Sequence, residues 1–169
     1  MLIQSLFDIE MDELTPCLLD SETGKIVRTT VIKLSITSAD CKGWRFDWTK
    51  EKSRGHDVYA LTVDGIVGIQ GLISLKIDHA NKAVFGVLIE AAPHNVGNKT
   101  KKYIGVGPHL VAFGCWIAKE AGYDAFYFDA KTNLIEHYKQ TLSAINISDQ
   151  RMVISGEAFE RLVTAYYEG

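Results

Sequence analysis

The pattern of hydrophobic and polar positions changes period after the first half of the chain. Before residue 91, apolar residues gather in short β-rich runs that predict strands at 58–63, 66–77 and 83–90. Asp64-Gly65 is a strong tight-hairpin signal, so we expect the first two of these strands to pair antiparallel. Upstream, residues 17–37 predict a hairpin with its polar turn at Gly24, and residues 2–14 fit a short amphipathic helix.

Beyond residue 103, apolar residues recur at helical spacing. They predict a helix from Pro108 that stops at Gly122, a buried strand at 125–128 and a second helix over 134–142, capped by Thr132 or Asp129. Short strands near 144–147 and 152–154 and a last helix over 157–167 complete the order. A strand–helix–strand step of this length is a right-handed crossover between parallel strands. The sheet is therefore expected to be mixed, and the fold class α/β with α+β character.

Composition narrows the class of protein. At 169 residues and 47% hydrophobic, the chain predicts one ordered domain with a real core. A net charge of −3 argues against a broad surface for nucleic acid or anionic membranes. The sequence shows no signal peptide and no uncharged stretch long enough to span a membrane. Three cysteines without a CxxC pair predict reduced thiols in a cytoplasmic protein.

The stretch KKYIGVGPHLVAFG, residues 101–114, places two glycines at the start of the predicted helix. A dinucleotide site asks for a third glycine, where this chain has Leu110, and for a preceding apolar strand, where it has a basic loop. A P-loop motif is missing. The remaining interpretation is an anion cradle, in which backbone N–H groups at Gly105 and Gly107 meet the positive end of the helix. Lys99, Lys101 and Lys102 add positive charge upstream.

This loop resembles a known motif. Lys102-Tyr-Ile-Gly105-Val-Gly107 is similar to the [QR]xxGx[GA] pyrophosphate loop of the GNAT superfamily of acetyl-CoA-dependent N-acetyltransferases. The order of strands and helices from about residue 25 to 154 also resembles that family, and residues 134–144 resemble its tyrosine-bearing helix. Two departures stand out: Lys131 replaces the usual asparagine, and Ser143-Ala144 replaces the usual Gly-Phe.

The resemblance implies a mixed, mostly antiparallel central sheet flanked by helices, with acetyl-CoA or coenzyme A as the cofactor. Residues 25–154 would form the acyl-CoA-binding domain, residues 1–24 an N-terminal helix and hairpin extension, and residues 155–169 a helix packed on the same domain. The residues expected to bind the cofactor are Ile89, Ala91, Lys102, Tyr103, Ile104, Gly105, Val106, Gly107, His109 and Tyr138.

The implied activity is transfer of an acetyl group from acetyl-CoA to an amine by direct attack. Such a reaction needs a base for the substrate ammonium and an acid for the departing thiolate. Tyr138, at the family's tyrosine, is the expected general acid, unless it only packs its helix on the sheet. Glu90, which closes an apolar strand, is the expected base, directly or through water, and His94 is its rival.

The aromatic residues Trp44, Phe46 and Trp48 lie where the family builds the wall of its acceptor site. They are candidates for binding an amine by cation–π contact, although a small satellite core under a loop is the simpler interpretation. His79 beside Asp78 is too small a set for a metal site, and no metal is expected. Gly114 is costly inside a helix, so we expect close helix–sheet packing there.

Two other functions stay open at this stage. One is a catalytically inactive acyl-CoA-binding module that serves as a sensor or interaction domain, which the departure at Lys131 favours. The other is a Rossmann-type NAD-binding protein. The acceptor could be a small molecule, a peptide or a protein, and nucleic acid is not expected as a partner except for a tRNA acceptor. The sequence sets neither the acceptor nor the oligomeric state.

Overall fold

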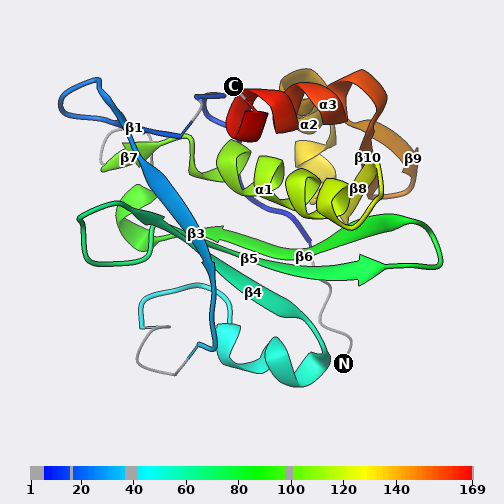
Figure 1. Cartoon of the computed structure of the whole chain (residues 1–169), viewed down its shortest axis with the longest axis horizontal. Coiled ribbons are helices and arrows are strands. Elements are labelled where there is room, and N and C mark those ends of the chain that lie inside the picture. The colour runs from blue at the N-terminus through cyan, green and yellow to red at the C-terminus, as the bar shows by residue number, and fades with distance from the viewer. Residues whose placement is uncertain (1–5, 16, 37–41, 98–100, 169) are drawn as a thin grey trace.

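The computed structural model describes residues 6–15, 17–36, 42–97 and 101–168. Its main feature is a seven-stranded sheet in the order β3–β4–β5–β6–β8–β10–β9 (Figure 1). The strands are β3 (Thr29–Lys33), β4 (Asp57–Val63), β5 (Gly71–Asp78), β6 (Ala83–Ala91), β8 (Ala125–Asp129), β9 (Ile145–Ser148) and β10 (Arg151–Ser155). Neighbouring strands are antiparallel except β6 and β8, which are parallel. This confirms the mixed, mostly antiparallel sheet.

A smaller sheet and the helices complete the fold. The smaller sheet joins β1 (Leu18–Asp20), β2 (Ile26–Val27) and β7 (Tyr103–Ile104). The helices are α1 (Val106–Glu120), α2 (Ile135–Leu142) and α3 (Gly156–Val163), which continues into a π-helical turn at Thr164–Glu168. Short 3-10 turns lie at Trp48–Lys50, Lys52–Arg54, Pro93–Asn95 and Thr132–Leu134. None of the helices in the described ranges is long and apolar enough to cross a membrane.

The sheet separates two cores (Figure 1). The larger core lies under α1 and includes Leu110, Val111 and Phe126. The smaller core lies on the opposite face, beneath the turns that follow Trp48, and contains Trp48, Val58, Ala60, Leu72, Val87 and Leu88. Because α1 connects the parallel strands β6 and β8, its N-terminus lies at the end of the sheet where β6 finishes.

Three local predictions were wrong. Asp64-Gly65 does not make a tight hairpin, because β5 begins only at Gly71 and residues 64–70 form the connection. Neither Thr132 nor Asp129 caps α2, which begins directly after a 3-10 turn without a side-chain capping bond. The helix expected over residues 2–14 is also not present in the described residues 6–15, whereas residues 2–5 lie outside the description.

Residues 6–13, which we call the N-terminal segment, are extended instead. Apolar Phe7, Ile9 and Met11 alternate with acidic residues in this segment, which is the period of a strand. Phe7 and Met11 are buried, and Phe7 forms a parallel bridge with Ala130 just beyond β8. Its N–H donates to the carbonyl of Asp129 at 2.7 Å, and its carbonyl accepts from the N–H of Lys131 at 3.0 Å. The segment therefore extends the sheet beside the end of β8.

A β-bulge in β6 opens the space that this segment enters. Ser74 pairs with Leu88 whereas Leu75 pairs with Gly86, which leaves Val87 as an extra residue in β6. The bulge resets the alternation, so that Val84 before it and Ile89 after it both face the larger core. Pairing of β6 with β8 ends at Gly86. Beyond that point the two strands separate.

Gly114 brings α1 close to the sheet, as the sequence predicted. A Cβ atom at this position would lie 2.4 Å from a ring atom of Phe126 on β8. Any side chain there would push the helix away from the strand, and with it the N-terminal turn of α1.

We expect Gly114→Ala to lower the free energy of unfolding by about 1–3 kcal/mol, because overpacking outweighs the better helix propensity of alanine. Urea denaturation measures the loss. In a Phe126→Leu background the ring atoms responsible are gone, so the penalty should shrink. Equal penalties in the two backgrounds would show that the contact with Phe126 is not the cause.

Candidate functional site

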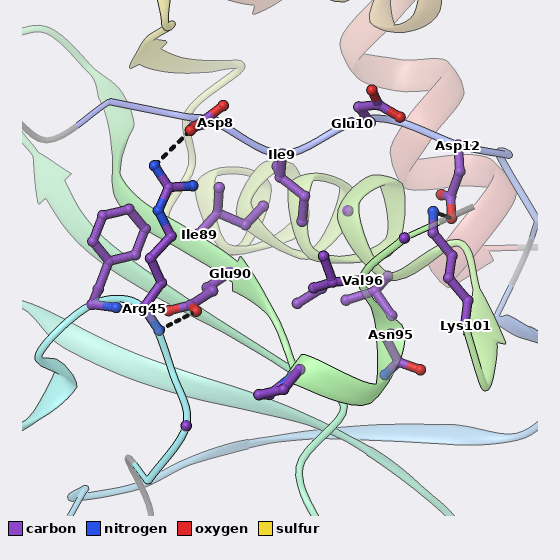
Figure 2. Close-up of a pocket in the computed structure, with 17 residues that line it drawn as sticks. Asp8, Ile9, Glu10, Asp12, Arg45, Ile89, Glu90, Asn95, Val96 and Lys101 are labelled. Atoms are coloured by element: carbon purple, nitrogen blue, oxygen red, sulfur yellow. Dashed lines mark hydrogen bonds and ion pairs between the residues drawn. The ribbon is translucent and has the colours of Figure 1, made fainter. Parts of the chain in front are cut away.

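A pocket of about 670 Å³ lies between the end of β6, the first turn of α1 and the N-terminal segment. Figure 2 shows Asp8, Glu10 and Asp12 along one rim, with Lys101 reaching to Asp12 and Glu90 on the opposite side. Among the described residues, no group of three or more His, Cys, Asp or Glu side chains is placed to hold a metal ion.

The two glycines of the predicted loop form an anion cradle at the start of α1. Gly105 is the N-cap residue and has a φ of +99°, a conformation that glycine adopts without strain. Its N–H lies 3.2 Å from both carboxylate oxygens of Asp12, and Lys101 Nζ lies 2.9 Å from Asp12 Oδ2. A Cβ at Gly107 would lie 3.0 Å from the carbonyl of Glu10. The cradle thus binds a carboxylate of its own chain.

Lys101, and not Lys102, supplies the positive charge of this cradle. Lys102 Nζ lies 3.5 Å from Asp20 and 3.7 Å from Glu22, so its side chain points to the β1–β2 hairpin. Tyr103 and Ile104 form β7 and pair with β1, whereas Val106 and Gly107 line the pocket. Lys99 lies outside the described residues.

His109 is in the first turn of α1, but its ring faces away from the pocket. Its Nε2 lies 2.7 Å from Thr29 Oγ1 on β3, and the ring packs against Tyr166. The side chain is buried, and this burial lowers the pKa of His109 to about 4. A neutral imidazole in this place packs the helix on the sheet and does not reach the cradle.

Tyr138 on α2 is fully buried, and the N-terminal segment engages its hydroxyl. The hydroxyl donates to the carbonyl of Ile9 at 2.6 Å and accepts from the N–H of Ile9 at 3.2 Å. Burial raises the pKa of Tyr138 above its usual value. The neighbouring His137 accepts from the N–H of Met11 at 2.8 Å. Tyr138 does not line the pocket, so the structure does not bring it together with Glu90 there.

Glu90 lines the pocket and holds the segment that follows Trp44. Its Oε1 accepts from the N–H of Phe46 at 3.1 Å and from the indole N–H of Trp48 at 2.9 Å. Its Oε2 accepts from the N–H of Arg45 at 2.6 Å. The neighbours Ile89 and Ala91 also line the pocket. Glu90 therefore joins the end of β6 to the loop on the opposite face of the sheet.

The rival base His94 and most of the predicted aromatic residues lie outside the pocket. His94 does not line the pocket, its Nε2 lies 2.7 Å from Gln70 Oε1, and partial burial lowers its pKa. Trp48 is part of the smaller core, and Trp44 and Phe46 pack against that core. Phe46 also lines the pocket. The aromatic group is thus mainly a satellite core with one member at the site.

Sequence reasoning missed the acidic rim and the ion pairs that it makes. Arg45 Nη2 lies 2.7 Å from Asp8 Oδ2, and Lys101 binds Asp12. The strict alternation of Phe7 to Asp12 could have revealed an extended segment, since its period is two. Asn95, also missed, is buried and accepts from the N–H of Tyr103 at 2.9 Å, which fixes the loop before the cradle.

Comparison with known proteins identifies the fold. No protein-family model matches the sequence, and no curated protein resembles it closely enough in sequence to count as a relative. Solved structures do match. A structure of AtaTR bound with acetyl-CoA has a TM-score of 0.55 and 16% identity and covers 79% of this chain and 97% of its own.

Two further structures agree. A bacterial toxin has a TM-score of 0.58 and 12% identity, with coverage of 83% of this chain and 96% of its own. An acetyltransferase of Bacillus subtilis in complex with CoA has a TM-score of 0.51 and 14% identity, with coverage of 76% and 99%. The chain therefore has the fold of the GNAT-type acetyltransferases, as the resemblance of its loop implied.

The buried His109 makes stability depend on pH. Its pKa is about 4 in the folded chain and about 6.5 when unfolded, so the unfolded chain binds a proton that the folded chain does not. Stability should therefore fall as the pH drops from about 6.5 toward 4, by up to about 3 kcal/mol. Urea denaturation at pH 7 and 4.5 should show a smaller fall for His109→Gln than for the wild type. Parallel pH dependences would contradict this assignment.

Proposed function

We propose that the protein is an acetyltransferase that moves an acetyl group from acetyl-CoA to an amine. The observation that carries the proposal is the cradle of Gly105, Gly107 and Lys101 at the start of α1, in the space where β6 and β8 separate. Backbone N–H groups, the helix N-terminus and a lysine together favour a pyrophosphate. The fold supports this assignment, because the solved structures that share it include ones with acetyl-CoA or CoA bound.

The end of β6 is suited to the arm of the cofactor. Ile89 and Ala91 line the pocket, and beyond Gly86 this edge of β6 no longer pairs with β8. Main-chain groups on a strand edge bind an extended amide chain as they would bind a neighbouring strand. With its phosphates on Gly105, Gly107 and Lys101, the pantetheine arm would run along Ile89–Ala91 and bring the thioester to Glu90.

Glu90 is suited to hold the acceptor. A carboxylate offers about four lone-pair positions, and three N–H groups occupy three of them here. The remaining position, on Oε2, would bind the substrate ammonium or a water that removes its proton. The amine nitrogen then attacks the thioester carbon, the C–N bond forms, the C–S bond breaks and the thiolate takes up a proton.

Two residues from the sequence analysis keep their proposed roles as alternatives. Tyr138 would protonate the thiolate only after its hydroxyl is released from Ile9. His94 remains the rival base, although Gln70 holds its Nε2.

An inactive acyl-CoA-binding module is the second candidate function. The observation that favours it is the closed hydrogen-bond set of Tyr138, whose hydroxyl both donates to and accepts from Ile9. Such a module would bind acetyl-CoA but release no free thiol with any amine. A Rossmann-type NAD site does not fit, because the central sheet is mostly antiparallel.

The two adjacent lysines provide a matched test of cofactor binding. Lys101→Ala should raise the Kd for acetyl-CoA about tenfold, since it removes a charge-assisted contact to a doubly charged pyrophosphate. Lys102→Ala removes the same charge at the β1–β2 hairpin and should leave the Kd unchanged. Isothermal titration measures both. A higher Kd for Lys102→Ala and an unchanged Kd for Lys101→Ala would show that Lys102 contacts the pyrophosphate, as the sequence motif predicted. No binding by the wild type would overturn the proposed function.

Catalysis is tested by a thiol-release assay over a panel of amines. Glu90→Gln should lower kcat by a factor of about 10²–10⁴, because the amide cannot accept the proton, while the Kd for acetyl-CoA stays the same. Tyr138→Phe separates the two candidate functions, since a loss of kcat at saturating acetyl-CoA supports an acid role. If no amine releases thiol although acetyl-CoA binds, the inactive module is the better description.

A further inference from the structure

The N-terminal segment contacts three elements around the cleft that the proposed function assigns to the cofactor. At the end of β8, Phe7 pairs with Ala130. On α2, Ile9 binds the hydroxyl of Tyr138. At the cradle, Asp12 binds Gly105 and Lys101. We propose that residues 8–12 are an autoinhibitory segment that competes with acyl-CoA for this cleft. The inference rests on the proposed function, since it concerns the regulation of the same site.

Asp12 takes the position of a phosphate. Its two oxygens share the N–H of Gly105 at 3.2 Å, and Lys101 Nζ reaches Oδ2 at 2.9 Å, with both side chains largely buried. The carbonyl of Glu10 lies so close to Gly107 that a Cβ there would be 3.0 Å from it. A pyrophosphate therefore cannot reach the glycine backbone while the segment is in place. The carboxylates of Asp8 and Glu10 beside it would also repel phosphate charges.

Lys131 and Arg45 hold the first part of the segment. Lys131, which replaces the family's asparagine, donates its N–H to the carbonyl of Phe7, and its Nζ lies 3.5 Å from Asp8 Oδ2. Arg45 binds the same carboxylate at 2.7 Å. The departure at Lys131 thus coincides with a contact to the segment.

Two different anchors hold the two parts of the segment. The ring of Phe7 stacks on Phe128 with a centroid distance of 4.5 Å, and it lies where Gly86 leaves room, 2.7 Å from the position of a Cβ there. From Asp8 to Asp12 the backbone and the acidic side chains make polar contacts, while the side chains of Ile9 and Met11 pack on the larger core. A pyrophosphate and a pantetheine arm offer the cleft polar contacts of the same kind. Residues 8–12 are therefore exchangeable for the cofactor, while Phe7 stays in the core.

In this arrangement only molecules whose segment has withdrawn can bind acyl-CoA. The apparent Kd is therefore the intrinsic Kd divided by the fraction of such molecules. A change that weakens the segment without touching the cradle should then tighten binding. Asp12→Ala is such a change, since it removes the carboxylate from Gly105 and Lys101. Glu13→Ala is the matched control, because it removes the same charge one residue later, from an exposed side chain.

Isothermal titration with acetyl-CoA tests the inference. The Kd should fall about tenfold in Asp12→Ala and stay unchanged in Glu13→Ala. Equal Kd values for Asp12→Ala and the wild type would overturn the autoinhibitory segment and leave the proposed function standing. No binding by the wild type or either variant would overturn both.

Hydrogen exchange on the wild-type protein tests the displacement without any substitution. The N–H groups of Ile9 and Met11 now donate to Tyr138 and His137. Saturating acetyl-CoA should speed exchange at these two amides at least about tenfold and slow it at Gly105. If acetyl-CoA binds while Ile9 and Met11 keep their protection, the segment and the cofactor occupy the cleft together, and the inference is wrong.

Discussion

The separation of β6 and β8 beyond Gly86 is the constraint on which the rest of the structure depends. One extra residue, Val87, turns β6 away from its parallel neighbour after only three paired positions. The helix that connects the two strands must then begin at the mouth of the gap, with its N-terminal N–H groups facing into it. Cradle, pocket and candidate base all lie along this one opening. A continuous β6–β8 ladder would leave no place for any of them.

An opening of this kind exposes main-chain groups that require hydrogen-bond partners. In this chain the N-terminal segment supplies them: its backbone bonds to Asp129 and Lys131, and its Asp12 bonds to Gly105. A cofactor with amides and phosphates would offer the same kinds of groups. The same demand therefore explains why the cleft suits an acyl-CoA and why a stretch of the chain's own backbone fits it. Either the segment or a cofactor could provide the hydrogen-bond partners that these main-chain groups require.

Elements set by local pattern could be predicted from the sequence, and elements set by distant pairing could not. Gly105 and Gly107 were recognisable because the positive φ and the close approach are properties of the loop itself. The choice of Lys101 over Lys102 was not, because it depends on distant contacts: the carbonyl of Lys102 accepts from the N–H of Ser21, and its side chain lies by Asp20 and Glu22. Asp64-Gly65 failed for a similar reason: the register of β5, with Gly71 opposite both Leu61 and Ala91, delays the start of that strand. Residues 7–12 have the alternation of a strand, but the partner that they pair with, the end of β8, is far away in the sequence.

The parallel bridge between Phe7 and Ala130 has a consequence for how the cleft is filled. A ligand that belongs to the same chain has a local concentration fixed by its tether, and dilution does not change it. The fraction of molecules with the segment in the cleft is then independent of the protein concentration. If the segment competes with acyl-CoA as proposed, the response depends on the concentration of acyl-CoA, and the strength of the tethered contacts sets the threshold.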